Sequence, residues 1–290
     1  MGAHRYTLLD VFTSTPLEGN ALAVVHDADD LDAQTMLAFA RETRLSETTF
    51  VQASHLAGAD YRNRIWTVER ELPFAGHPSL GTAVAVARAE RRAGAPREVR
   101  YVQETGAGLQ PIDVRLAAGD DHRAYASMLQ EPAVHGEESG RAAPLAAIGL
   151  TPEHADRALP PQIVSSGAAH LIVPLRDVEA LTQAKPDYAA IEPLLAKHGA
   201  LALYAVVCDP ANASARARSF VSTAVGEDPA TGSAAGPLCA YLAVRADCTR
   251  VTIEQGVEMR RPSRLEAAME GERPRVGGDV VVVADGVLTL

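Results

Sequence analysis

Aromatic side chains are scarce in this chain, at only 4% of 290 residues, although 47% of its residues are hydrophobic. A buried core must therefore be packed mainly from Ala, Val and Leu. Cysteine is scarce as well: the three residues, Cys208, Cys239 and Cys248, are scattered and form no C-x-x-C pair. This pattern predicts neither disulfides nor structural zinc, and it favours a reducing compartment, which we take to be the cytoplasm.

Several functional signatures are also missing. The formal net charge is −10, and no basic run exceeds the pairs Arg91-Arg92 and Arg260-Arg261, which argues against nucleic acid or an anionic membrane as partner. No window predicts a membrane span, and the first residues lack a signal-like apolar core. Neither nucleotide-binding glycine motif occurs, and no histidine pair has metal-ligand spacing. We therefore expect no metal, nucleotide or flavin cofactor.

The most informative stretch that is present is Gly226–Val244, which reads GEDPATGSAAGPLCAYLAV. Acidic residues precede Pro229, a turn of small residues follows, and the apolar run after it predicts a buried helix over Pro229–Val244. The first turn of a helix leaves backbone N–H groups unpaired and partly positive, so it can hold a carboxylate ligand. A helix cap without any ligand is the alternative, because caps use the same residue types.

A second helix entry of the same kind occurs about half the chain earlier. His77–Ala83 and Asp228–Ala234 both read x-P-x-x-G-[S/T]-A, and both lead into an Ala-rich apolar run. The repetition predicts a duplicated domain, with central helices over Pro78–Arg92 and Pro229–Val244. We expect the two helix N-termini to face one cleft and to grip a small anionic substrate from both sides.

The rest of the chain predicts a mixture of strands and helices. Glu47 stands at the mouth of a strand over Thr48–Val51, where it could equally be a solvated strand end. A capped helix is expected over Thr151–Arg157, and a hairpin turn at Ala284–Gly286. The polar break at Ala117–Asp121 suggests a domain boundary. We predict an N-terminal domain of residues 1–118 plus 279–290 and a C-terminal domain of residues 119–278, with the active site in the cleft between them.

The sequence resembles the phenazine-biosynthesis PhzF-like isomerases, which share the diaminopimelate-epimerase fold. The resemblance runs along most of the chain and rests on the segments DVFTSTPLEGNALAVV, LSETTFV, ELPFAGHPSLGTA, RSFVSTAVGEDPATGSAAGPLCAYL and IEQGVEMRRPSRL. It implies an α+β fold of two pseudo-symmetric domains, each a curved mixed sheet or barrel around a central helix. It also implies that the last strand returns to the first domain.

The resemblance further assigns roles to residues. Glu47 matches the general acid/base of the family, and His77, Asp228 and Ser233 match its substrate-contacting polar residues. Glu47, His77 and Asp228 are the predicted catalytic residues. The predicted substrate-binding residues are Asn20, Gly76, Thr231, Gly232 and Ser233. One carboxylate on a stiff strand end can remove a proton from one carbon and return it to another, which is isomerase chemistry without a cofactor. We expect a small carboxylate-bearing metabolite as the substrate and a homodimer as the assembly.

Two other functions stay open at this stage. Amino-acid epimerases and racemases of the same fold carry a cysteine at each helix entry, but here Ala75-Gly76-His77 and Asp228-Pro229-Ala230 stand there. Two-thiol racemisation is thus disfavoured, with Cys239 expected to be a core residue. An epimerase or lyase acting on a small amino or hydroxy acid with the same residues remains possible. So does a ligand-binding module without catalysis, because a fold does not fix a function.

Overall fold

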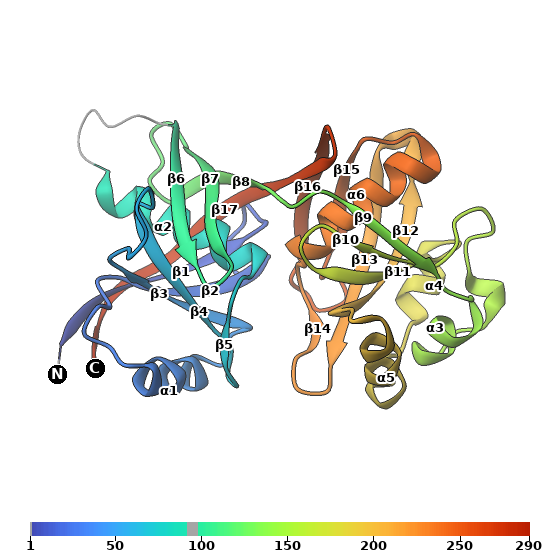
Figure 1. Cartoon of the computed structure of the whole chain (residues 1–290), viewed down its shortest axis with the longest axis horizontal. Helices are drawn as coiled ribbons and strands as arrows, with labels where there is room; N and C mark the ends of the chain where they lie inside the picture. The colour runs from blue at the N-terminus through green and yellow to red at the C-terminus, as the bar shows by residue number, and fades with distance from the viewer. Residues whose placement is uncertain (1, 92–97) are drawn as a thin grey trace. The chain divides into compact units, whose positions relative to one another are not determined.

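The computed structural model describes residues 2–91 and 98–290, and the chain divides into two compact units (Figure 1). Unit 1 comprises Met1–Met128 and Gly277–Leu290, and unit 2 comprises Leu129–Val276. The first boundary falls ten residues beyond the predicted one, because the polar turn at 117–121 joins two paired strands of unit 1. Two strands, β8 (Arg123–Leu129) and β17 (Arg273–Thr289), have residues in both units.

Unit 1 is a closed mixed barrel of eight strands. Around it, β17 pairs with β1, β1 with β2, β2 with β3, β3 with β4, β4 with β6, β6 with β7, β7 with β8, and β8 with β17. The pairs β2–β3 and β4–β6 are parallel. The other elements of unit 1 are β1 (Ala3–Val11), β2 (Asn20–Val25), α1 (Ala33–Thr43), β3 (Glu47–Gln52), β4 (Tyr61–Trp66), β5 (Glu71–Leu72), α2 (Gly76–Glu90), β6 (Glu98–Thr105) and β7 (Gly108–Leu116).

Unit 2 repeats this order of pairings. Its strands pair successively as β10–β11, β11–β12, β12–β13, β13–β15 and β15–β16, and the second and fourth of these pairs are parallel. The run from β1–β2 to β6–β7 in unit 1 has the same alternation. The elements are β9 (Val134–Glu138), α3 (Ala142–Ala147), β10 (Gln162–Ser165), β11 (Ala169–Pro174), α4 (Val178–Gln183), α5 (Tyr188–His198), β12 (Ala202–Asp209), β13 (Ser214–Ser222), β14 (Gly226–Asp228), α6 (Gly232–Ala246), β15 (Arg250–Gln255) and β16 (Ser263–Glu270).

The matching pairings confirm the predicted α+β fold of two pseudo-symmetric halves. Each half has one central helix in the same place in its strand order: α2 lies between β4 and β6 in sequence, and α6 lies between β13 and β15. In unit 1, α2 contacts six of the barrel strands, and in unit 2, α6 contacts β10, β11, β15 and β16. Small residues let strands approach these helices closely, which explains why they are rich in Ala and Gly.

The central helices begin at different residues from those predicted. Helix α6 starts at Gly232 rather than Pro229, and α2 starts at Gly76 rather than Pro78. The acidic residue before Pro229 is therefore not a helix cap, since Asp228 belongs to the short strand β14. Almost all of α2 is buried up to Ala87, as expected for a helix with no polar face. The predicted end of this helix at Arg92 lies outside the described residues.

Three other expectations were wrong. The predicted helix over Thr151–Arg157 is only a 3₁₀ turn at Pro152–His154, closed by a reciprocal contact between the side chains of Thr151 and His154. The predicted turn at Ala284–Gly286 is part of the continuous strand β17, whose residues there pair with β1. Helices α3 and α4 were missed, because six residues are too short for a helical period to stand out.

Candidate active site

Glu47 and His77 lie against each other inside unit 1. Nε2 of His77 is 3.3 Å from Oε2 of Glu47, and their side chains are only 7% and 16% exposed. Glu47 is the first residue of β3, opposite Leu22 of the parallel strand β2, and His77 is the second residue of α2. The strand end and the helix start thus bring together two residues that are far apart in the sequence.

Asn20 fixes the protonation pattern of this pair. Its Nδ2 atom lies 3.3 Å from Nδ1 of His77. An amide nitrogen can only donate, so with the amide in this orientation Nδ1 of His77 accepts and the ring hydrogen stands on Nε2, the nitrogen on the side of Glu47. Burial lowers the pKa of His77 to about 3, so the ring is neutral at neutral pH. Asn20 and Glu47 therefore lie at the two nitrogens of a neutral ring, but the 3.3 Å approach of Nε2 to Oε2 does not have the geometry of a hydrogen bond.

The predicted residues of unit 2 gather where β14 meets α6. Oδ2 of Asp228 accepts a 2.6 Å hydrogen bond from Oγ1 of Thr231. The fully buried Gln255 holds the same turn, because its Nε2 donates to the backbone oxygen of Asp228 (2.7 Å) and to Oγ1 of Thr231 (3.0 Å), while Oε1 accepts from the Thr231 amide (3.2 Å). The Tyr204 hydroxyl donates to that same Oε1 at 3.0 Å. These bonds fix the direction of the Asp228 carboxylate.

The residue after Gln255 must be glycine for this arrangement to form. Gly256 has a φ of +77°, and a Cβ atom there would lie 2.6 Å from the backbone oxygen of Pro229. Any side chain would be strained by the backbone and would collide with the Asp228–Thr231 turn.

A buried ion pair fixes the strand that carries Asp228. Nε and Nη2 of Arg218 on β13 each donate a 2.8 Å hydrogen bond to the carboxylate of Glu227. Nη1 of Arg218 also donates to the backbone oxygens of Leu181 (3.1 Å) and Ala184 (2.8 Å). The arginine is 8% exposed and the glutamate 15%. Because Glu227 directly precedes Asp228, this clamp limits where the Asp228 side chain can lie.

Ser233, the second residue of α6, contacts His170. Its Oγ atom is 3.1 Å from Nε2 of His170 on β11. Gly232, the first residue of α6, is tied to another part of unit 2, because its backbone oxygen accepts from Nε2 of Gln130 at 2.9 Å. The predicted residues thus fall into two groups. Unit 2 holds Asp228, Thr231, Gly232 and Ser233 in one turn of the chain. Unit 1 holds Asn20, Glu47, Gly76 and His77, which come from two strands and a helix.

The cysteines have no part in either group. Cys239 is fully buried within α6, and burial raises the pKa of its thiol to about 12, which keeps it protonated and unreactive. No group of three or more His, Cys, Asp or Glu side chains that could hold a metal occurs in residues 2–91 and 98–290. Over the same ranges, no helix combines the length and apolar character needed to cross a membrane.

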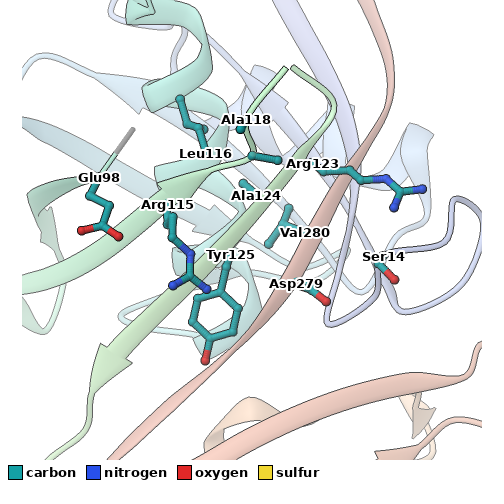
Figure 2. A pocket seen from close by; sticks show the side chains of 11 residues that line it. Ser14, Glu98, Arg115, Leu116, Ala118, Arg123, Ala124, Tyr125, Asp279 and Val280 are labelled. Atoms are coloured by element: carbon teal, nitrogen blue, oxygen red, sulfur yellow. The ribbon is translucent and has the colours of Figure 1, made fainter. Parts of the chain in front are cut away.

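A cavity of about 530 Å³ opens in unit 1, but its lining includes neither Glu47 nor His77 (Figure 2). It lies over β7, β8 and β17, where the guanidinium of Arg115 stacks on the ring of Tyr125 at 5.2 Å. Arg123 and Asp279 add exposed charges of opposite sign. The cavity is therefore separate from the predicted catalytic group.

Comparison with known proteins identifies the family. The model of the family described as "Phenazine biosynthesis-like protein" matches residues 9–286. The chain belongs to this family. A curated relative from Pseudomonas aeruginosa, named trans-2,3-dihydro-3-hydroxyanthranilate isomerase, is 40% identical over 280 residues, which cover 94% of this chain and 93% of the relative. A relative of the same name from Pseudomonas chlororaphis is 38% identical and covers 99% and 100%. This member of the phenazine biosynthesis-like family is thus an enzyme of the isomerase type.

Solved structures agree with this family and fold. A structure titled "predicted epimerase" from Pseudomonas aeruginosa is 33% identical, covers 99% of both chains and superposes with a TM-score of 0.86. A hydroxyproline epimerase from Agrobacterium vitis has a TM-score of 0.68, with 99% of this chain and 91% of that chain covered. At 12% identity the second likeness shows the shared fold alone.

Three residues around these groups were not singled out from the sequence. Gln255 lies within the quoted segment IEQGVEMRRPSRL, yet its side chain had no assigned role. His170 is the single polar residue in the apolar strand AHLIVP, which was the available signal. Arg218 occurs in a strand of alternating Ala and Arg, where an arginine is ordinarily expected to be exposed.

Proposed function

We propose that this phenazine biosynthesis-like protein is a cofactor-independent isomerase that moves a proton between two carbons of a small carboxylate-bearing substrate, with Glu47 as the proton-transferring group. The observation that carries the proposal is the contact between Oε2 of Glu47 and Nε2 of His77. General acid–base catalysis needs a titratable group held in place and largely shielded from water, and Glu47 meets both conditions.

The position of Glu47 beside a neutral His77 supports Glu47 as the base. Nε2 of this uncharged ring lies 3.3 Å from Oε2 of Glu47, so a polar group stands next to the proposed base without competing with it as a charge. An ionised Glu47 removes a proton from one carbon of the substrate, becomes neutral, and returns the proton to another carbon. In this proposal His77 and Asp228 are the further catalytic residues, because each is a polar group fixed by a hydrogen bond.

We assign substrate binding to Asn20, Gly76, Thr231, Gly232 and Ser233. Gly76 and Gly232 are the first residues of α2 and α6, where backbone N–H groups have no partner within the helix. These backbone N–H groups and the hydroxyl of Ser233 can donate hydrogen bonds to a carboxylate of the substrate. The assignment predicts that Ser233→Ala weakens binding as well as rate, whereas Glu47→Gln affects rate alone.

The names of the curated relatives suggest the first substrate to test, trans-2,3-dihydro-3-hydroxyanthranilate. The purified protein is incubated with this compound and the product is identified by NMR. A product of unchanged mass with a shifted double bond supports the proposal. A product differing only in configuration at one carbon indicates an epimerase, and loss of water or ammonia indicates a lyase. Binding without turnover would indicate a ligand-binding module.

Cofactor independence has its own test. A carboxylate base needs no metal or nucleotide for proton transfer, so exhaustive dialysis against EDTA should leave kcat and KM unchanged. Loss of activity together with a stoichiometric metal, restored by adding that metal back, would contradict the proposal. The cytoplasmic location and the homodimer stay predictions; sedimentation equilibrium tests the second, with twice the mass of one chain expected.

A further inference from the structure

His170 is buried so completely that its contact with Ser233 is the main polar feature of its surroundings. The residue is 1% exposed on β11, and its neighbours in the sheet are Val164 on β10 and Ala202 on β12. Its Nε2 atom lies 3.1 Å from Oγ of Ser233. Burying a polar ring costs free energy unless the ring is hydrogen-bonded, and the contact with Ser233 offsets that cost. The direction of this hydrogen bond decides what the Ser233 hydroxyl can do.

The other ring nitrogen shows which atom carries the hydrogen. Nδ1 of His170 is buried and has no hydrogen-bond partner in the part of the chain that the structure describes. Burial lowers the pKa of His170 to about 4, so the ring is neutral at pH 7 and carries a single N–H. An orphaned buried N–H is rarer than an under-used acceptor, so the hydrogen belongs on Nε2 and is donated to Ser233.

Ser233 then has its own hydrogen left to give. Its oxygen accepts from His170, and the residue is only half-buried, whereas His170 and Ala234 beside it are buried. A serine in a helix often donates to the backbone oxygen four residues earlier, but no such bond exists for Ser233 in the described structure. The hydroxyl hydrogen is therefore available to an acceptor on a ligand.

We propose that His170 is a positioning residue that donates to one lone pair of Ser233, which leaves the Ser233 hydroxyl hydrogen for an acceptor, such as a carboxylate oxygen, on the substrate. The proposal rests on the proposed function insofar as Ser233 contacts the substrate. Without His170, the Ser233 hydroxyl loses this bond and spends part of its time in orientations that turn its hydrogen away from the substrate.

The first test needs no substrate. The protein is labelled with ¹⁵N-histidine, and the tautomer of His170 is read from the chemical shifts of its two ring nitrogens. We expect the Nε2–H form in the wild type, and a change at Nε2 on replacing Ser233 with alanine. A wild-type ring protonated on Nδ1 would overturn the proposal, whatever reaction the enzyme performs.

The second test uses steady-state kinetics with trans-2,3-dihydro-3-hydroxyanthranilate. His170→Leu should raise KM about 10- to 100-fold, the worth of one hydrogen bond to a charged group, with a smaller change in kcat. His170→Gln retains an N–H donor near the position of Nε2 and should restore most of the loss. In a Ser233→Ala background, His170→Leu should add little. Independent, additive effects of the two changes would contradict the proposal.

Controls separate this proposal from a purely structural role and from the proposed reaction. His26→Gln alters another buried histidine, which bonds Thr7 in unit 1, and should lower the melting temperature without raising KM. If Glu47→Gln retains turnover while His170→Leu raises KM as stated, the proposed mechanism fails and the role of His170 stands. If His170→Leu lowers the melting temperature and leaves KM unchanged, the role proposed for His170 fails, whatever Glu47→Gln shows of the proposed mechanism.

Discussion

Nε2 of His77 lies 3.3 Å from Oε2 of Glu47, although the two residues belong to a helix start and a strand end. Asn20 donates to Nδ1 on the other side of the ring. Glu47 therefore lies against a buried ring that its surroundings keep neutral.

His77→Leu should lower kcat by about 10-fold or more, because Glu47 loses the polar ring that lies against its carboxylate. The measurement is steady-state turnover at saturating substrate. The control His55→Gln alters an exposed histidine and should leave kcat unchanged. A His77→Leu enzyme with the wild-type kcat would show that the contact has no catalytic role.

The buried pair Arg218–Glu227 should be worth far more to stability than a surface pair. Glu227→Gln leaves the charge of Arg218 buried without its partner and should destabilise unit 2 by about 3–5 kcal/mol. Asp27→Asn breaks the exposed pair with Arg5 and should cost less than about 1 kcal/mol. Urea denaturation of the two variants gives both numbers. Equal losses would contradict the clamp assigned to Glu227.

Gly236 in α6 is expected to resist replacement by a better helix former. Alanine normally stabilises a helix interior by about 1 kcal/mol relative to glycine. Here a Cβ atom would lie 2.9 Å from Cδ of Gln130 and closer still to Oε1, whose side chain bonds Ser166 and Gly232. Gly236→Ala should therefore destabilise by about 1–3 kcal/mol. Gly140→Ala, where nothing lies within 4 Å, is the control and should be near neutral in urea denaturation. A stabilised Gly236→Ala protein would show that Gln130 moves aside freely.

Three buried histidines should make stability depend on pH, and one of them is His77, whose pKa burial lowers to about 3. Burial lowers the pKa of His26 to about 4, with nearby Arg5 adding to the effect, and burial alone lowers the pKa of His170 to about 4. Between about pH 4 and 6.5 the unfolded chain binds protons that the folded chain does not. The stability that these neutral histidines contribute is therefore fully present above about pH 6.5, and it is lost as the pH falls toward 4.

Melting temperatures measured between pH 5 and 8 check this sign. The wild type should melt at lower temperature at pH 5 than at pH 7, and His26→Gln and His170→Gln should each flatten that slope. A slope that neither substitution changes would mean that other groups carry the pH dependence.

The sequence predicted the elements whose signals are local and missed those set by distant partners. The Ala-rich runs after Pro78 and Pro229 identified both central helices. Helix α2 starts two residues before Pro78, which lies in its first turn, and α6 starts three residues after Pro229. The Ala-Asp-Gly sequence at 284–286 looks like a turn. It is strand because it pairs with β1 and because Asp285 accepts both guanidinium donors of Arg88.

The candidate site shows the same division. Glu47, His77, Asp228 and Ser233 could be named from the family segments that contain them. The contact between His170 and Ser233 joins residues 63 positions apart, and the bond of Tyr204 to Gln255 joins residues 51 apart, so only the folded chain reveals them. Local periodicity carries no information about such pairs.

The measurement that tests the central claim most directly is deuterium incorporation by the Glu47→Gln enzyme. The wild type and the variant are each incubated with trans-2,3-dihydro-3-hydroxyanthranilate in heavy water, and the product is analysed by NMR and mass spectrometry. If Glu47 transfers the proton, the wild type should form product carrying deuterium at the new C–H position in every turnover in which the carboxyl proton exchanges with heavy water before it is returned. The variant should bind the substrate with a similar Kd but turn it over about 10²- to 10⁴-fold more slowly. A Glu47→Gln enzyme that binds normally and forms deuterated product at the wild-type rate would contradict the account and leave His77 and Asp228 as the acid–base pair.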